Sequence, residues 1–99
     1  MVKSNSKEYI KLNKKKYHFY EIKWFDILGD SGHANYKEFE DMQPAIIITN
    51  AYIFSKDNFS IKTFSSYSQD EEVFSDRNVI PTGCIIKIKK IKRHNGTTN

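Results

Sequence analysis

The feature that most constrains the fold is an apolar stretch directly after Pro44, Ala-Ile-Ile-Ile-Thr-Asn-Ala-Tyr-Ile-Phe over residues 45–54. Three consecutive isoleucines favour a strand over a helix, because side chains branched at Cβ crowd a helical turn and pack well on a pleated surface. The stretch is far shorter than the ~20 apolar residues that a membrane-spanning helix needs. We therefore expect a central strand in the single core that a chain of 99 residues can build.

Other parts of the chain alternate apolar and polar residues with period two, the pattern of a strand with one buried face. In the first of them, Tyr20, Ile22 and Trp24 are the apolar positions, so Trp24 is expected to face the core. Phe25 follows directly and breaks the alternation, which indicates a bulge. The further strands cover residues 59–63, 73–80 and 84–91, separated by a hairpin turn at 55–58, a polar loop at 67–72 and a break at 81–83.

Residues 35–42 are the best helix candidate. Asn35, followed three residues later by Glu38, matches a capping box, in which each side chain bonds the backbone N–H of the other residue. Tyr36, Phe39 and Met42 recur at a spacing of three and form one face of a two-turn helix.

These elements predict a mainly β fold, a five-stranded antiparallel meander curled into a small SH3-like or Sm-like barrel, with one short helix between strands 1 and 2. An open five-stranded sheet with the helix packed on one face is the alternative. The barrel domain is expected over residues 17–91, between a flexible basic arm at residues 1–16 and a disordered tail at residues 92–99.

The net charge of +4 hides a segregation of charge along the chain. Residues 1–23 and residues 84–99 each carry a net charge of +5, whereas residues 24–83 carry −6. The termini of small domains often lie close together, and the two ends would then form one basic patch. The alternative is that both ends are solubilising tails around a weakly acidic domain.

The residues with reactive side chains do not form a pattern that indicates catalysis. The sequence Gly-Asp-Ser-Gly at residues 29–32 is like the nucleophile loop of chymotrypsin-like proteases, which need two barrels, so it is interpreted as a turn. Asp26, Asp30 and His33, with His18, lack a recognised metal-ligand spacing. The lone Cys84 excludes an internal disulfide and is interpreted as a small buried hydrophobic residue. We expect no enzymatic activity, no cofactor and no bound metal.

Aromatic residues make up 14% of the chain, and most of them are needed to build the core. Those left to stack on a ligand are Tyr20, Tyr52 and Tyr67. Aromatic rings interleaved with lysines on a small barrel are typical of proteins that bind single-stranded nucleic acid.

Five short motifs together resemble the pattern of a family of small uncharacterised phage and prophage accessory proteins. The motifs are Trp24-Phe25-Asp26, Asp30-Ser31-Gly32-His33-Ala34, Pro44-Ala45, Ala51-Tyr52-Ile53 and Ile80-Pro81-Thr82-Gly83-Cys84-Ile85. The chain differs from the family at His33, where an aromatic residue is more usual, and at Ala51, where Gly is. The resemblance covers about residues 20–91 and implies a phage gene expressed for host takeover.

The function expected from these observations is that of a non-enzymatic phage accessory protein in the cytoplasm of the host bacterium. It would counteract host immunity by binding, either blocking a host protein or sequestering a signalling nucleotide. The alternative is a single-stranded nucleic-acid-binding protein that uses the basic ends and the aromatic residues. Contact with a membrane is not expected, and a homo-oligomer could form through edge strands. The candidate binding residues are Asp26, Asp30, Ser31, His33 and Tyr36 around the first turn, and Lys87 and Lys89 on the last strand.

Overall fold

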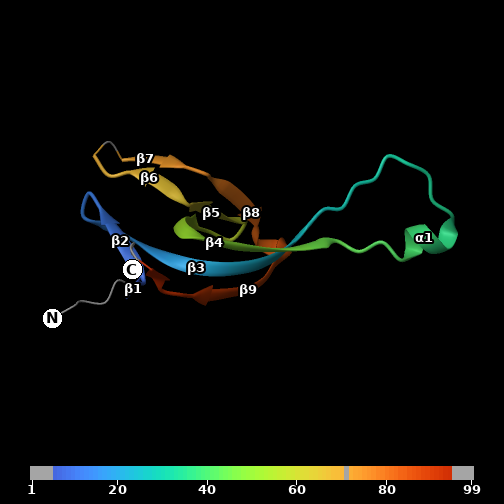
Figure 1. Cartoon of the computed structure of the whole chain (residues 1–99), viewed down its shortest axis with the longest axis horizontal. Helices are drawn as coiled ribbons and strands as arrows, with labels where there is room; N and C mark the ends of the chain where they lie inside the picture. The colour runs from blue at the N-terminus through green and yellow to red at the C-terminus, as the bar shows by residue number, and fades with distance from the viewer. Residues whose placement is uncertain (1–5, 71, 95–99) are drawn as a thin grey trace.

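The computed structural model describes residues 6–70 and 72–94, which form a mainly β, antiparallel fold with one short α-helix (Figure 1). The helix, α1, covers Tyr36–Glu40, and a 3₁₀ turn, η1, covers Thr82–Cys84. The strands are β1 (Ser6–Lys7), β2 (Tyr9–Leu12), β3 (Lys15–Asp26), β4 (Ala45–Lys56), β5 (Ser60–Phe64), β6 (Ser66–Ser68), β7 (Val73–Ser75), β8 (Asn78–Pro81), β9 (Ile85–Lys90) and β10 (Arg93–His94).

The main sheet has six strands in the order β2-β3-β4-β5-β8, with β9 also paired to β3. Strands β2 and β9 lie end to end along one edge of β3. At their junction the Phe19 N–H donates to the Glu8 carbonyl at 2.7 Å, and the Ile91 N–H donates to the Phe19 carbonyl at 3.0 Å. Because the N–H and C=O of one strand residue point the same way, both neighbours lie on the same edge, and β4 covers the other.

The predicted five-stranded barrel is wrong. Within the described part of the chain, the end strands β2 and β8 do not pair with each other, so the sheet stays open. The chain does not continue as a meander after β8, because η1 turns it and β9 returns to β3. The alternative of an open sheet covered by the helix is also wrong in its second half, since α1 has no buried residue.

The prediction of a central strand after Pro44 is confirmed. Strand β4 pairs with β3 on one edge and with β5 on the other. Its consecutive residues Ala51 and Tyr52 are both almost completely buried. Since neighbouring residues of a strand face opposite sides of the sheet, β4 is covered on both faces at this point.

The core is built around a cluster of aromatic rings. Tyr17, Tyr52 and Phe64 are buried together with Leu12, and partly buried side chains surround them, namely Ile10, Phe19, Tyr67 and Phe74. The ring centroids of Tyr17 and Phe64 lie 5.4 Å apart and those of Phe64 and Phe74 4.7 Å apart, both in edge-to-face arrangements that aromatic pairs favour. Burial raises the pKa of the Tyr17 hydroxyl, and the charge of Glu72 raises it further.

Residues 66–80 differ from the prediction. Ser66–Ser68, at the start of the segment expected as a polar loop, forms β6, and the strand expected over residues 73–80 is divided into β7 and β8. The division falls at Asp76, which has a φ of 53°. The Ser66 hydroxyl donates to the Asp76 carboxylate at 2.6 Å, so a side chain holds the bend that interrupts the strand.

The basic segment before Tyr17 is not a simple arm. Tyr9–Leu12 forms β2, and Leu12 is 2% exposed. Strands β1 and β10 pair with each other, which places the two ends of the described chain side by side. The remaining residues of the predicted arm and tail, 1–5 and 95–99, lie outside the described residues.

Trp24 is half-buried rather than enclosed in the core. Its indole Nε1 donates to the Thr49 hydroxyl of β4 at 3.0 Å. The bulge predicted at Phe25 is not found, because β3 pairs with β4 without a shift from Phe19 to Asp26. The register with β9 shifts between Lys23 and Trp24, where Ile86 of β9 is the extra residue.

Candidate functional site

Residues 27–44, which we call the projection, leave the sheet between two paired strands. Asp26 at the end of β3 pairs with Ala45 at the start of β4, so the chain departs and returns at adjacent points. The projection carries α1 far from the sheet along the long axis of the molecule (Figure 1). It extends a molecule that measures 62 × 31 × 21 Å.

Helix α1 is held by its own hydrogen bonds. The predicted capping box is confirmed: the Glu38 N–H donates to the Asn35 side chain at 2.8 Å, and the Asn35 N–H donates to the Glu38 carboxylate at 2.9 Å. Lys37 and Asp41 form an exposed ion pair at 3.3 Å, one turn apart. The capping box and the ion pair therefore stabilise the helix locally, although none of its residues is buried.

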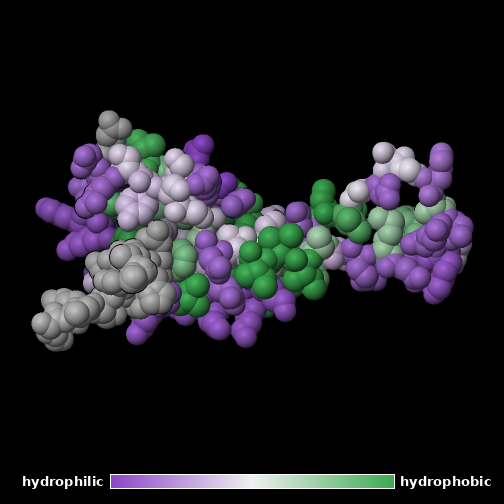
Figure 2. All heavy atoms as spheres, in the orientation of Figure 1, coloured by the Kyte–Doolittle hydropathy of each residue, from purple (hydrophilic) through white to green (hydrophobic). Residues whose placement is uncertain are grey.

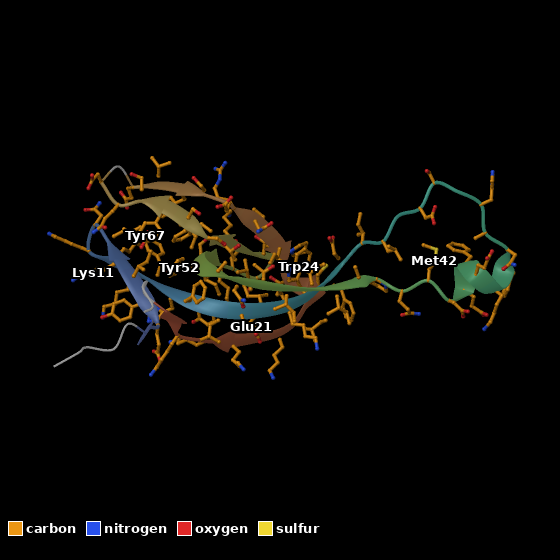
Figure 3. The ribbon with its side chains drawn as sticks, in the orientation of Figure 1. Lys11, Glu21, Trp24, Met42, Tyr52 and Tyr67 are labelled. Atoms are coloured by element: carbon orange, nitrogen blue, oxygen red, sulfur yellow. The ribbon has the colours of Figure 1, made fainter. Side chains whose placement is uncertain are left out.

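The predicted apolar face of α1 exists, but the chain does not bury it. Tyr36 is 82% exposed and Phe39 is 71% exposed. Met42, third on this face, is partly covered and lies far from the core residues Tyr52 and Tyr67 (Figure 3). The structure therefore leaves Tyr36, a candidate binding residue, and its neighbour Phe39 exposed to solvent.

The five candidate residues around the first turn all lie on the projection or at its base, but they have different roles. The Asp26 carboxylate accepts the Ile27 N–H at 2.8 Å, and the Asp30 carboxylate accepts the Gly32 N–H at 2.8 Å. These two carboxylates therefore shape the loop. Ser31, His33 and Tyr36 are exposed and remain candidates for direct contact.

An exposed apolar surface continues from the projection onto the sheet. Ile27 is 88% exposed and Leu28 52% exposed, directly after β3. On the sheet, the cross-strand pair Phe25 and Ile46 is exposed, as is Ile48. Figure 2 shows apolar residues gathered where the sheet meets the projection. Sequence reasoning placed Phe25, Ile46 and Ile48 in strands and missed their exposure, because alternation along a strand does not show whether another element covers a given face.

Lys87 and Lys89 are exposed on β9, on the sheet rather than the projection. Lys87 pairs with Lys23 and Lys89 pairs with Glu21 across β3. Lysines directly opposite one another repel, whereas Lys89 and Glu21 form an oppositely charged pair. The structure therefore separates the predicted binding residues into an acidic projection and a basic sheet face.

Of the three tyrosines considered for ligand stacking, Tyr52 is buried, whereas Tyr20 and Tyr67 are half-buried. Tyr52 is 1% exposed and packs edge-to-face with Tyr67 at 6.0 Å. Tyr20 is half-buried, with the Lys90 ammonium 6.0 Å from its ring centroid. At the basic end, Tyr9 is 39% exposed and the Lys16 ammonium lies 4.8 Å from its ring.

Within the described ranges, no group of three or more His, Cys, Asp or Glu side chains is arranged to hold a metal ion. Cys84 is a free thiol, half-buried rather than fully buried as expected. The described residues also contain no helix long and apolar enough to cross a membrane.

Comparisons of this chain with protein families, with curated proteins and with solved structures gave no match.

Proposed function

We propose that this chain is a non-enzymatic binding protein that acts by docking its projection onto another protein. The observation that carries the proposal is that Tyr36 and Phe39 are 82% and 71% exposed on a helix without a buried residue. Exposed apolar patches mark interaction sites, and aromatic side chains dominate the binding energy of protein interfaces.

The local bonds of the projection support this function. A helix as short as α1 is marginal in water, because forming the first turn costs more than one hydrogen bond returns. The capping box and the ion pair between Lys37 and Asp41 offset part of that cost. A helix that is already formed loses less conformational entropy on binding, which strengthens the complex.

The charge of the projection supports a protein as the partner. With Asp26 included, residues 26–44 hold five acidic residues and one lysine, a net charge of −4. A signalling nucleotide or a nucleic acid is anionic and is repelled by this surface. Of the partners implied by the resemblance to phage accessory proteins, a host protein fits the projection better, and docking would block the surface that it covers.

A photo-crosslinking experiment tests the proposal. A photoreactive phenylalanine analogue replaces Tyr36 in the full chain, expressed in bacterial cells, and Phe59 is replaced in a matched control. Phe59 is 83% exposed but lies in the turn between β4 and β5, outside the projection. We expect a covalent protein adduct from position 36 and none from position 59. If position 36 gives no protein adduct, the proposal is wrong.

A second candidate function, binding of single-stranded nucleic acid, is favoured by the basic sheet face. Lys23 lies directly opposite Lys87, and Lys89 is on the same strand as Lys87. The pairing of β1 with β10 also brings the two basic ends of the chain together. Phosphates would relieve the repulsion between the paired lysines.

Fluorescence anisotropy with a labelled single-stranded oligonucleotide tests this candidate. For a nucleic-acid-binding protein, the variant Lys87→Ala with Lys89→Ala lowers the affinity, and added salt weakens wild-type binding steeply because counterions are released. Lys37→Ala, on the projection, is the control and leaves the affinity unchanged. Equal affinity of the double variant and the wild-type protein excludes this face as the binding surface.

A further inference from the structure

A groove of about 580 Å³ opens beside the aromatic core, between β5, β8 and the hairpin of β6 and β7. Phe54, Phe64 and Phe74 line it, and Phe54 remains 40% exposed. Val73 and Val79 add apolar surface and are 49% and 62% exposed. The groove therefore exposes part of the aromatic core to solvent.

The charged residues that line the groove are both basic. Lys62 on β5 and Arg77 just before β8 are among its lining residues, and no carboxylate is found among the described residues that line it. Lys62 is paired with Val79 across the two strands, so a cation lies directly beside exposed apolar surface. The groove thus suits a ligand that is aromatic and acidic.

The projection of the same chain has that chemistry. Helix α1 presents Tyr36 and Phe39 beside Glu38, Glu40 and the C-cap Asp41. Residues 26–44 carry a net charge of −4, opposite in sign to Lys62 and Arg77, the two charged residues that line the groove. Charges of opposite sign on the two surfaces favour their encounter and set their relative orientation.

We propose that the groove of one copy of this chain receives helix α1 of a second copy. Tyr36 and Phe39 enter the groove over Phe54 and Phe74, and the carboxylates of α1 face Lys62 and Arg77. The inference rests on the proposed function, because it names the protein onto which the projection docks.

The geometry favours a second copy over an intramolecular contact. The projection and the hairpin of β6 and β7 lie at opposite ends of the long axis, so α1 does not reach the groove of its own chain (Figure 1). Two copies side by side in opposite directions place each projection along the other body. This arrangement is a closed two-fold dimer in which both projections and both grooves are used.

Each projection contributes two aromatic side chains to the proposed interface, and aromatic side chains bury roughly 150–250 Å² apiece when they are fully covered.

Sedimentation velocity of the full chain, together with light scattering, tests the proposal. We expect the wild-type protein to be a dimer with twice the 11.7 kDa mass of the chain. The variants Tyr36→Ala with Phe39→Ala, and Lys62→Glu with Arg77→Glu, are each expected to be monomers. Circular dichroism confirms that each variant is folded, and Phe59→Ala, which removes an equally exposed ring elsewhere, remains a dimer.

Mixing the two monomeric variants provides the decisive control. The projection variant keeps an intact groove and the groove variant keeps an intact projection, so the mixture forms a 1:1 complex although neither variant associates alone. A dimer that persists in both variants would place the interface elsewhere, for example on the sheet around Ile46 and Ile48, and would overturn the inference. The mixture keeps one of the two contacts of the dimer, so its affinity is expected to be lower than that of the wild-type protein. Two folded monomeric variants that show no association even at their highest soluble concentration would also overturn the inference.

The wild-type mass separates this inference from the proposed function. If the wild-type chain is a monomer at its highest soluble concentration, the inference is wrong. In that case a crosslink from position 36 to a different protein keeps the proposed function, and the absence of any crosslink removes both.

Discussion

The sheet and the projection use the same kinds of residues in opposite ways. In the sheet, Tyr52 and Phe64 are 1% exposed and contact each other at a centroid distance of 5.3 Å. In the projection, Tyr36 and Phe39 are mostly exposed. Both regions contain regular secondary structure, but only the sheet buries its aromatic side chains against one another. Regular local structure therefore does not show that a segment belongs to the core.

This difference affects the dimensions of the molecule. The Cα radius of gyration is 17.6 Å, whereas a compact domain of about 100 residues has a value of about 13 Å. A chain that holds an apolar helix away from its core gives up the hydrophobic stabilisation that packing would provide. The difference between the two regions can be tested by substitutions that act on one of them and leave the other unchanged.

The largest expected effect is at the centre of the aromatic core. Phe64 is 1% exposed and contacts the rings of Tyr17, Tyr52 and Phe74. Phe64→Ala is expected to lower the free energy of unfolding by about 3–5 kcal/mol, because it removes buried surface and leaves a cavity. Urea denaturation followed by tryptophan fluorescence measures the loss.

The matched substitution in the projection is Phe39→Ala, made in the groove variant Lys62→Glu with Arg77→Glu, which is expected to be a monomer, so that dimer dissociation does not contribute. Phe39 is 71% exposed, so its removal is expected to change the free energy of unfolding by less than about 0.5 kcal/mol. A loss comparable to that of Phe64→Ala would show that the helix packs against the sheet, and would remove the distinction between the two regions.

Structural features that depend on neighbouring residues could be predicted from the sequence in both regions. Contacts between segments that are far apart in the chain could not. The capping box at Asn35 and the strand after Pro44 depend on residues close together in the chain, and both are confirmed. The return of β9 to β3, and the exposure of Phe39, depend on which surfaces meet in space. Period-two alternation shows which residues of a strand share a face, but it does not show which strands pair with each other. For this reason the prediction of a barrel was wrong. Among the candidate site residues, the turn at residues 29–32 was predicted, and the Asp30 carboxylate accepts the Gly32 N–H within it, whereas the bond from the Ile27 N–H to the Asp26 carboxylate was not predicted.

The second prediction concerns the cap of α1. Asn35→Ala removes the side chain that accepts the Glu38 N–H and is expected to destabilise the helix by about 1 kcal/mol. In the monomeric groove variant Lys62→Glu with Arg77→Glu, where α1 has no buried residue, the effect is expected to stay local and to leave the thermal midpoint of the sheet unchanged. Amide hydrogen exchange measures both regions in one experiment. Faster exchange throughout β3 and β4 would show that the projection and the sheet unfold as one unit.

The third prediction concerns a buried hydroxyl in the sheet. Thr63 is 2% exposed, and among the described residues its Oγ1 has no hydrogen-bond partner. Thr63→Val replaces the hydroxyl with a methyl group and is expected to raise the free energy of unfolding by about 1 kcal/mol. Thr49→Val is the contrasting control, because it removes the acceptor of the Trp24 indole and is expected to destabilise the protein. A lower melting temperature for Thr63→Val would contradict the prediction.

The smallest expected effect concerns a turn in each region in which an Asp carboxylate accepts backbone N–H groups. The Asp57 carboxylate accepts the N–H groups of Phe59 and Ser60 at 2.7 and 2.9 Å in the sheet, as Asp30 accepts that of Gly32 in the projection. The bonds from Phe59 and Ser60 lower the pKa of Asp57 below its usual value. Its stabilising contribution is therefore complete above the unfolded pKa of about 3.9 and is lost as the pH falls through the lower folded value.

In thermal denaturation, Asp57→Asn is expected to lower the melting temperature slightly at pH 7 and to have less effect at the acid end of the range. Asp30→Asn is expected to leave the melting temperature unchanged, because the projection does not pack against the sheet. An equal loss from both substitutions would show that the projection contributes to the cooperative stability of the sheet.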